Sequence, residues 1–144
     1  MERNFENNAY FFNAFKKLEQ SYTKHLLKAL GRFTLSPNEI EVLCCLIHTN
    51  SAREIVAMTD VSKGLVSRSV KSLKEKGYIT AQVSDTDKRE QTLVLTSKGE
   101  EIRLAIEETR AQFFEKAFNH FETTERQVFE ALLKMMTNNI GTEE

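Results

Sequence analysis

Apolar residues recur every three or four positions over residues 5–30, which is the spacing of one face of an α-helix. The positions are Phe5, Ala9, Phe12, Phe15, Leu18, Tyr22, Leu26, Ala29 and Leu30. Gly31 follows directly, and glycine commonly stands just past the end of a helix. The pattern therefore predicts a long amphipathic helix that Gly31 ends.

A capping signal predicts where the next helix begins. Ser36 and Glu39 have the spacing of a capping box, in which two backbone amides at the helix start are satisfied by side chains. Pro37 suits the first helical position because its fixed backbone angle is helical and it has no N–H to leave unpaired. We expect this helix to run over about residues 37–48.

Two further helices follow in close succession. Ser51 repeats the capping-box spacing and predicts a short helix that ends near Met58 or Thr59. Ser62 can cap the helix that follows it, which Gly77 would end. The apolar stripe expected on this helix consists of Leu65, Val66, Val70 and Leu73.

The rest of the chain predicts a hairpin and two more helices. Residues 78–83 and 91–95 are rich in β-branched and aromatic residues and flank a charged stretch, which indicates a β-hairpin with a charged tip. Apolar periodicity then predicts a helix from 97 to about 121 and a last helix from 123 or 124 to about 140. The fold class expected is therefore mainly α with a small β-wing.

Length and composition narrow the class of protein. A chain of 144 residues suffices for one core, so we expect a single domain over residues 1–144. One proline and five glycines favour long helices with few tight turns. No apolar run reaches the roughly 18 to 20 residues of a transmembrane helix, and no signal peptide is recognisable, so we expect a cytoplasmic protein without membrane contact.

The charge distribution indicates a partner for the helix capped by Ser62 and for the hairpin. Residues 62–89 hold seven basic and three acidic residues, a net charge of plus four, whereas the remainder holds 13 basic and 18 acidic residues, a net charge of minus five. A net charge of minus one for the whole chain thus conceals one electropositive region, which suits a phosphate backbone. By itself, such a run of charge on a helix is more often an ordinary solvated face.

The helix capped by Ser62 and the helix before it have the arrangement of a helix-turn-helix, whose second helix enters the major groove of double-stranded DNA. Arginine can bind guanine with two hydrogen bonds, serine can reach base edges or phosphates, and glycine allows close approach. The hairpin tip can reach an adjacent minor groove. The candidate DNA-binding residues are Ser62, Lys63, Gly64, Ser67, Arg68 and Lys71 on the helix, and Lys88 and Arg89 on the tip.

Residues 62–79 resemble the recognition helix and first wing strand of MarR-family regulators. Asp87 and Arg89 resemble the Asp-x-Arg of the family's wing, and the Leu-x-Leu-Thr-x-x-Gly pattern from Leu93 to Gly99 follows at the expected spacing. Many relatives carry a further arginine where this chain has Thr86, so a weaker grip of the wing is expected. The resemblance implies a winged helix-turn-helix over residues 35–99, flanked by dimerisation helices over 1–34 and 100–144.

This resemblance implies a sequence-specific transcriptional regulator, most often a repressor, that binds a pseudo-palindromic operator as a homodimer and responds to a small amphipathic or aromatic effector. Apolar residues on more than one face of the terminal helices also favour a dimer. The alternative is a winged-helix module that binds an acidic protein partner instead of specific DNA. We expect no enzymatic activity, because no nucleophile triad, phosphate loop or His-Glu-x-x-His helix is present.

One helix face carries the residues that offer other chemistry. Glu41, Cys44 and His48 are spaced three and four apart and suggest a metal site, but structural zinc usually needs four ligands. Cys44 and Cys45 are adjacent, which makes a poor disulfide pair, and they suggest oxidant sensing as a second alternative. The default interpretation is a packed helix face with inert thiols, and we expect no cofactor and no metal.

Overall fold

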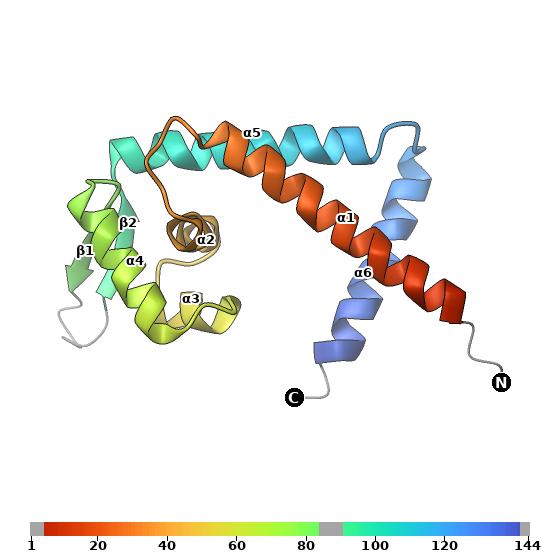
Figure 1. Ribbon diagram of the computed structural model, residues 1–144, viewed down its shortest axis with the longest axis horizontal. Coiled ribbons are helices and arrows are strands. Elements are labelled where there is room, and N and C mark those ends of the chain that lie inside the picture. The colour runs from red at the N-terminus through yellow and green to blue at the C-terminus, as the bar shows by residue number, and fades with distance from the viewer. Residues whose placement is uncertain (1–4, 84–90, 142–144) are drawn as a thin grey trace. The chain divides into compact units, whose positions relative to one another are not determined.

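The computed structural model describes residues 5–83 and 91–141 (Figure 1). Within these ranges the chain forms six α-helices and one antiparallel β-hairpin, which confirms the mainly α fold with a small wing. In chain order the elements are α1 Phe5–Ala29, α2 Pro37–Leu46, α3 Ala52–Met58, α4 Lys63–Glu75, β1 Ile79–Val83, β2 Gln91–Leu95, α5 Ser97–Ala117 and α6 Thr123–Gly141. No helix in the described part of the chain is long and apolar enough to cross a membrane.

The chain divides into two compact units, Met1–Arg110 and Ala111–Glu144. The first unit holds α1 to α4, the hairpin and most of α5. The second holds the end of α5 together with α6. The expectation of a single domain over residues 1–144 stays a prediction.

Side-chain caps explain where α2 and α3 begin. The capping box of α2 is formed as expected, because Ser36 Oγ accepts from the Glu39 amide and the Ser36 amide donates to Glu39 Oε1, both at 3.2 Å. In α3 only half of the box forms. Ser51 Oγ accepts from the Glu54 amide at 3.4 Å, but the Glu54 carboxylate accepts from the Thr49 hydroxyl instead of the Ser51 amide.

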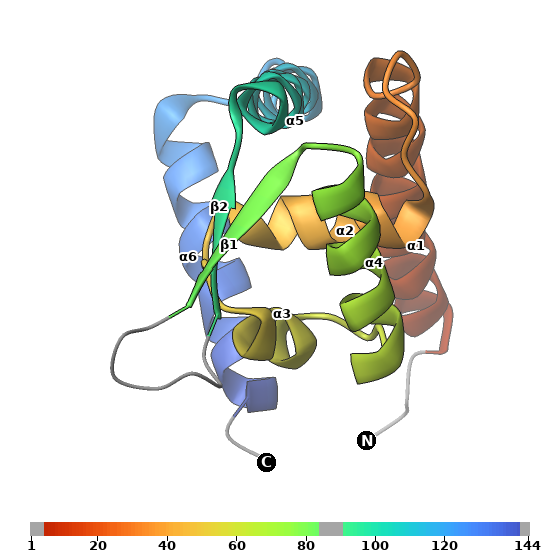
Figure 2. The same cartoon turned by 90° about the vertical axis from the view of Figure 1, so that its left-hand side faces the viewer.

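The hairpin pairs Ile79 with Leu95 at its base and Val83 with Gln91 at the last described pair. A third segment joins it, since Ser51 forms an isolated bridge with Thr92. Figure 2 shows β1 and β2 side by side, near α3 and α4. The start of α3 is thereby tied to the wing, which the sequence analysis did not anticipate.

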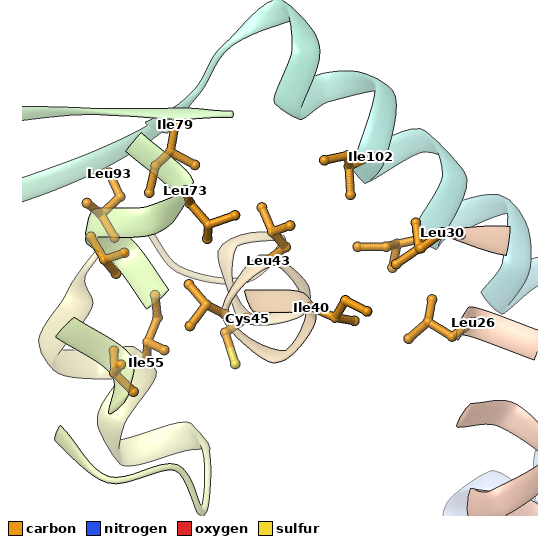
Figure 3. Close-up of a cluster of buried hydrophobic side chains, with 14 residues drawn as sticks. Leu26, Leu30, Ile40, Leu43, Cys45, Ile55, Leu73, Ile79, Leu93 and Ile102 are labelled. Carbon is orange, nitrogen blue, oxygen red and sulfur yellow. The ribbon is translucent and has the colours of Figure 1, made fainter. Parts of the chain in front are cut away.

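One hydrophobic core fills the first unit, and Figure 3 shows its side chains meeting around α2. It joins α1, the helices α2, α3 and α4 of the helix-turn-helix region, both strands and α5. Its members are Leu26, Leu30, Ile40, Val42, Leu43, Cys45, Ile55, Val66, Val70, Leu73, Ile79, Leu93, Ile102 and Ile106. Of the apolar face expected for α1, Tyr22, Leu26 and Leu30 pack here. The expected members Phe12, Phe15 and Leu18 are 69%, 40% and 45% exposed and do not belong to this core.

Aromatic rings organise the second unit. The Phe118 ring lies 4.5 Å from Phe114 and 5.5 Å from Phe129, centroid to centroid, and the Arg126 guanidinium covers both Phe114 and Phe118. α5 ends at Ala117, earlier than the expected residue 121, because the following turn contains His120 with a positive φ of 69°.

α6 differs from the helices of the first unit, because none of its residues is buried. Its large exposed apolar residues are Val128, Phe129, Leu132, Met135 and Ile140.

Candidate nucleic-acid interface

Both ends of α4 are fixed by the residues that the sequence indicated. Ser62 is the N-cap, and its side chain accepts from the Leu65 amide at 3.3 Å. At the other end Gly77 adopts a φ of +81°, which glycine tolerates best. The amides of Gly77 and Tyr78 each donate to a carbonyl of the last turn at 3.0 Å, which is the Schellman pattern. The helix therefore leads directly into β1.

One side of α4 is buried and the other side is exposed. Val66, Val70 and Leu73 are at most 7% exposed and pack in the core, together with the hydroxyl-bearing Ser69. The prediction that Leu65 shares this stripe is wrong, because it is 40% exposed. Adjacent residues on a helix lie about 100° apart, so the face that buries Val66 turns Leu65 toward solvent.

All six of the candidate contact residues on α4 or at its cap lie on the solvent side, namely Ser62, Lys63, Gly64, Ser67, Arg68 and Lys71. Spacings of four and three put Gly64, Arg68 and Lys71 on one face. A Cβ atom added at Gly64 would meet nothing within 4 Å, so the fold itself does not require glycine there. The candidates Lys88 and Arg89, with Thr86 and Asp87, fall outside the described residues.

Lys76, which was counted in the electropositive region, is instead used inside the fold. Its Nζ donates to both oxygens of Glu39, at 2.8 and 2.9 Å, and to the Thr34 carbonyl at 2.8 Å. The Ser72 hydroxyl donates to the same carboxylate at 3.4 Å. Burial alone would raise the pKa of Glu39, but hydrogen bonds from Lys76 and Ser36 outweigh it and lower this pKa below its ordinary value.

Two of the basic residues counted in the electropositive region, Lys76 and Lys74, are engaged within the fold, so fewer cations are available to a ligand. Lys74 Nζ donates to the Gln91 side chain at 3.2 Å and so links α4 to β2. Lys63, Arg68 and Lys71 are the basic residues of α4 for which the structure shows no such partner among the described residues. These three cations lie within the first nine of the 13 residues of α4, on its exposed side.

The Thr-x-x-Gly at the end of the wing has a structural role. The Thr96 hydroxyl donates to the Gly77 carbonyl at 2.6 Å, and the Thr96 amide donates to the Tyr78 carbonyl at 3.0 Å. The Gly99 amide in turn donates to the Thr96 hydroxyl. A side chain at Gly99 would overlap the Tyr78 carbonyl oxygen. These contacts hold the end of β2 against the turn that follows α4.

With this geometry in place, relatives of the chain can be compared with it. Residues 33–90, which include α2, α3, α4 and β1, match the sequence model of the MarR family. YwoH, an uncharacterised HTH-type transcriptional regulator of Bacillus subtilis (strain 168), is 30% identical over 108 residues, which are 74% of this chain and 78% of YwoH. The chain belongs to the MarR family. MarR-family proteins are transcriptional regulators and not enzymes, so this chain is a transcriptional regulator.

Solved structures, several of them of MarR-family proteins, share the fold over almost the whole chain. A MarR-family protein of Bacillus stearothermophilus superposes with a TM-score of 0.79 at 15% identity, over 97% of this chain and 99% of that one. A regulator of Methanosarcina mazei Go1 gives 0.75 at 18% identity, over 93% and 99%. BpsR of Bordetella bronchiseptica, whose DNA binding is regulated by 6-hydroxynicotinic acid, gives 0.66 at 18% identity, over 89% and 98%.

The helix face considered for metal binding lies against a cation in this MarR-family chain. Arg110 Nη1 lies 3.4 Å from His48 Nε2. Because arginine can only donate, the histidine Nε2 accepts this hydrogen bond. Burial raises the pKa of the Cys44 thiol to about 11, although the nearby Arg110 charge acts in the opposite direction. Within the described ranges no three His, Cys, Asp or Glu side chains cluster closely enough to hold a metal. These features favour a packed face with an unreactive thiol.

Arg110 also lines a cavity of about 540 Å³ between α1, α2 and α5. Its Nε donates to Tyr22 Oη at 3.2 Å, and Leu26, Leu27 and Ile40 supply apolar wall. No carboxylate among the described residues forms an ion pair with this arginine. No local sequence pattern marks Arg110, because nothing near residue 110 indicates that Tyr22, 88 positions earlier, lies beside it.

Proposed function

We propose that this MarR-family regulator binds a pseudo-palindromic operator as a homodimer and represses transcription until a small effector releases it. The observation that carries the proposal is α4, a capped helix with polar and cationic residues exposed beside its N-terminus. An α-helix fits the major groove of B-DNA, where the N-terminal residues of a recognition helix contact base edges. The exposed residues of α4 are therefore proposed to contact the bases and phosphates of DNA.

Within this proposal the exposed residues divide by chemistry. Arg68 suits bidentate recognition of a guanine, whereas Lys63 and Lys71 suit phosphates. Ser67 has a hydroxyl for either target. The Ser62 oxygen caps α4 and leaves its hydrogen able to donate outward. Gly64 would allow the helix to approach the bases closely, and Lys88 and Arg89 are proposed to reach the adjacent minor groove.

The dimer is proposed from the apolar residues that the chain leaves uncovered. The exposed apolar residues of α6 support a role for the proposed dimerisation segments, residues 1–34 and 100–144, around the winged region 35–99. A two-fold dimer would insert two α4 helices into successive major grooves, roughly 34 to 36 Å apart. It would consequently select an inverted repeat.

The effector is proposed to be an amphipathic or aromatic acid bound in the cavity beside Arg110. The guanidinium can donate two hydrogen bonds to a carboxylate, and Leu26, Leu27 and Ile40 suit a ring. Glu19 and Glu41 also line the cavity, so a bound acid would have to place its carboxylate at Arg110 and away from them. BpsR, whose DNA binding is regulated by the aromatic acid 6-hydroxynicotinic acid, supports this ligand class. Because α2 lines the cavity and packs on α4, an occupant that favours one position of α2 would alter the position of α4.

Selection of duplexes from a random pool tests DNA binding and symmetry together, since a dimer should enrich an inverted repeat. Affinity for the selected duplex should then fall steeply between low and moderate salt. Arg68→Ala should weaken specific binding by about 1–3 kcal/mol, and Lys88→Ala should mainly reduce the salt slope. Lys24→Ala, an exposed lysine of α1, is the control. A chain that selects no duplex and shows no salt-dependent affinity would instead fit the protein-interaction alternative.

Calorimetric titration with 6-hydroxynicotinate and benzoate tests the effector site. Wild type should bind at least one of them and lose operator affinity, whereas Arg110→Ala should not bind either. Benzamide, which has the same ring without a charge, is the matched control ligand. Binding that persists unchanged in Arg110→Ala would argue against this cavity while leaving the DNA-binding proposal standing.

A further inference from the structure

Leu65 is the apolar residue of α4 that the fold leaves in solvent. The structure describes α4 in full, and there Val66, Val70 and Leu73 are at most 7% exposed, whereas Leu65 is 40% exposed. Core packing therefore does not account for a leucine at this position. Its backbone is nevertheless held firmly, because the Leu65 amide donates to the Ser62 cap at 3.3 Å.

The neighbours of Leu65 restrict the kind of partner that it can meet. Lys63 stands in the same first turn, and Arg68 follows three residues later on the adjoining helix surface. An apolar side chain flanked by cations is poorly matched to a purely apolar protein groove. It suits a polyanion that also presents an apolar group, and in the DNA major groove that group is the 5-methyl of thymine.

The position of Leu65 along α4 suits contact with a base. It is the third residue of the helix, and the N-terminal residues of a recognition helix are those that contact base edges. Gly64 precedes it and has no side chain to hold the helix away from the groove floor. A leucine in the first turn can therefore reach a methyl group that a residue at the C-terminal end of α4 would not.

We propose that Leu65 recognises the 5-methyl group of a thymine in each operator half-site. The inference rests on the proposed function, since it needs α4 in the major groove, and it adds a preference for thymine to the guanine contact proposed for Arg68. Burying one methyl group against an apolar side chain contributes about a 3- to 5-fold preference per half-site. Two half-sites together give about 10-fold or more.

Replacement of thymine by deoxyuridine removes this methyl group and changes no hydrogen-bonding group. In the duplex selected above, symmetric thymine pairs are replaced one pair at a time, and affinity is measured by fluorescence anisotropy. One pair should lower the affinity of wild type by about 10-fold. Leu65→Ala should bind the unmodified duplex more weakly and lose its sensitivity to that pair, whereas Leu65→Met should keep it. Val94→Ala, at an exposed apolar residue of β2 outside the candidate contacts and the dimerisation segments, should be as sensitive as wild type.

Two results would overturn the inference while the proposed function stands: a wild-type protein indifferent to every thymine replacement, or a Leu65→Ala variant as sensitive as wild type. Circular dichroism spectra that coincide for wild type and variant would show that the change acts on recognition and not on folding. Failure of wild type to select any duplex or to respond to salt would refute the proposed function, and the thymine contact with it.

Discussion

The core of the Met1–Arg110 unit takes in apolar side chains from α1 to α4, both strands and α5, whereas α6 in the second unit buries none of its residues. The contrast is not one of composition, since α6 contains large apolar residues such as Phe129 and Leu132, which are 41% and 53% exposed. The winged region thus buries most of its large apolar residues within the chain, although Met58, Leu65, Val83 and Val94 stay exposed, whereas α6 buries none.

This difference indicates which part of the chain depends on a partner. Fully burying one large apolar side chain is worth about 1.5–3 kcal/mol, so several left in water along one helix represent a large unused contribution. Isolated exposed leucines are ordinary, but a row of them along a helix is typical of an interface. We therefore expect α6 to gain its stability from a second copy of the chain.

Leu132→Asp should produce the largest effect on this comparison. Leu132 is 53% exposed, so in a monomer a carboxylate there would change stability by no more than about 0.5 kcal/mol. In a dimer that covers Leu132, each of the two chains would bury an unpaired charge in the interface, and the dimer Kd should rise by about 100-fold or more. Analytical ultracentrifugation over a concentration series measures this constant.

The control for that variant is Gln127→Asp, which adds the same charge to an exposed polar position about 140° away from Leu132 around α6. It should dimerise like wild type. A Leu132→Asp variant that also dimerises like wild type would show that α6 is not the interface.

Burial within the first unit should make the Cys44 thiol a poor nucleophile. Of the effects predicted here, this one should be the second largest. Burial raises the pKa of its thiol from 9.0 to about 11, so the reactive thiolate should be roughly 100-fold scarcer near neutral pH. In a Cys45→Ala background, iodoacetamide should modify the native protein correspondingly slowly, and the rate should climb until about pH 11. Urea-unfolded protein is the control. Native and unfolded rates that match would favour oxidant sensing instead.

Replacing Lys76 or Lys74 tests which lysine stabilises the first unit and which one is not needed for folding. Lys76→Met leaves a buried carboxylate with fewer donors, so the free energy of unfolding at pH 7 should fall by about 1–2 kcal/mol. Lys74→Met, whose lysine only reaches the exposed Gln91, should stay within about 0.5 kcal/mol of wild type. Urea unfolding followed by circular dichroism measures both, and equal losses would contradict a special role for Lys76.

The same pair predicts a pH dependence. Because the pKa of Glu39 is lower in the folded than in the unfolded chain, its stabilising contribution is present above the ordinary value of 4.5 and is lost as the pH falls through the folded value. Glu39→Gln should therefore be less stable than wild type at pH 7, and the gap should narrow below pH 4.5. A gap that stays constant on acidification would show that Glu39 is not held ionised by this pair.

Local signals were sufficient to predict the elements, because their causes lie within a few residues. Ser36 and Glu39 form the capping box that their spacing indicated, and Gly77 ends α4 with the positive φ that favours glycine. Ends without such a signal were placed less well. α2 ends at Leu46 instead of about residue 48, where the amides of His48 and Thr49 both turn back to the Cys45 carbonyl.

Contacts between distant segments could not be predicted in the same way. From the sequence alone, Lys76 is indistinguishable from the other cations of a basic helix. Only the fold brings it to Glu39, 37 residues earlier. Leu65 reads as one more member of an apolar stripe, and only the packing of Val66 shows which way the helix faces. The six candidate residues on the exposed side of α4 and at its cap follow from local pattern, whereas Arg110 and its cavity follow from tertiary structure.

Gly64→Ala should give the smallest effect and separates folding of the first unit from its proposed contact with DNA. No atom lies within 4 Å of the added methyl group, and alanine restricts the unfolded chain, so the free energy of unfolding should rise by about 0.5 kcal/mol. If α4 approaches the bases closely at this point, operator affinity should fall by a similar amount although the fold is more stable.

Gly141→Ala, at an equally open glycine at the end of α6, should leave operator affinity unchanged. A Gly64→Ala variant that is more stable and binds the operator at least as tightly as wild type would mean that glycine is not needed there for close approach, and that contact with the groove begins further along α4.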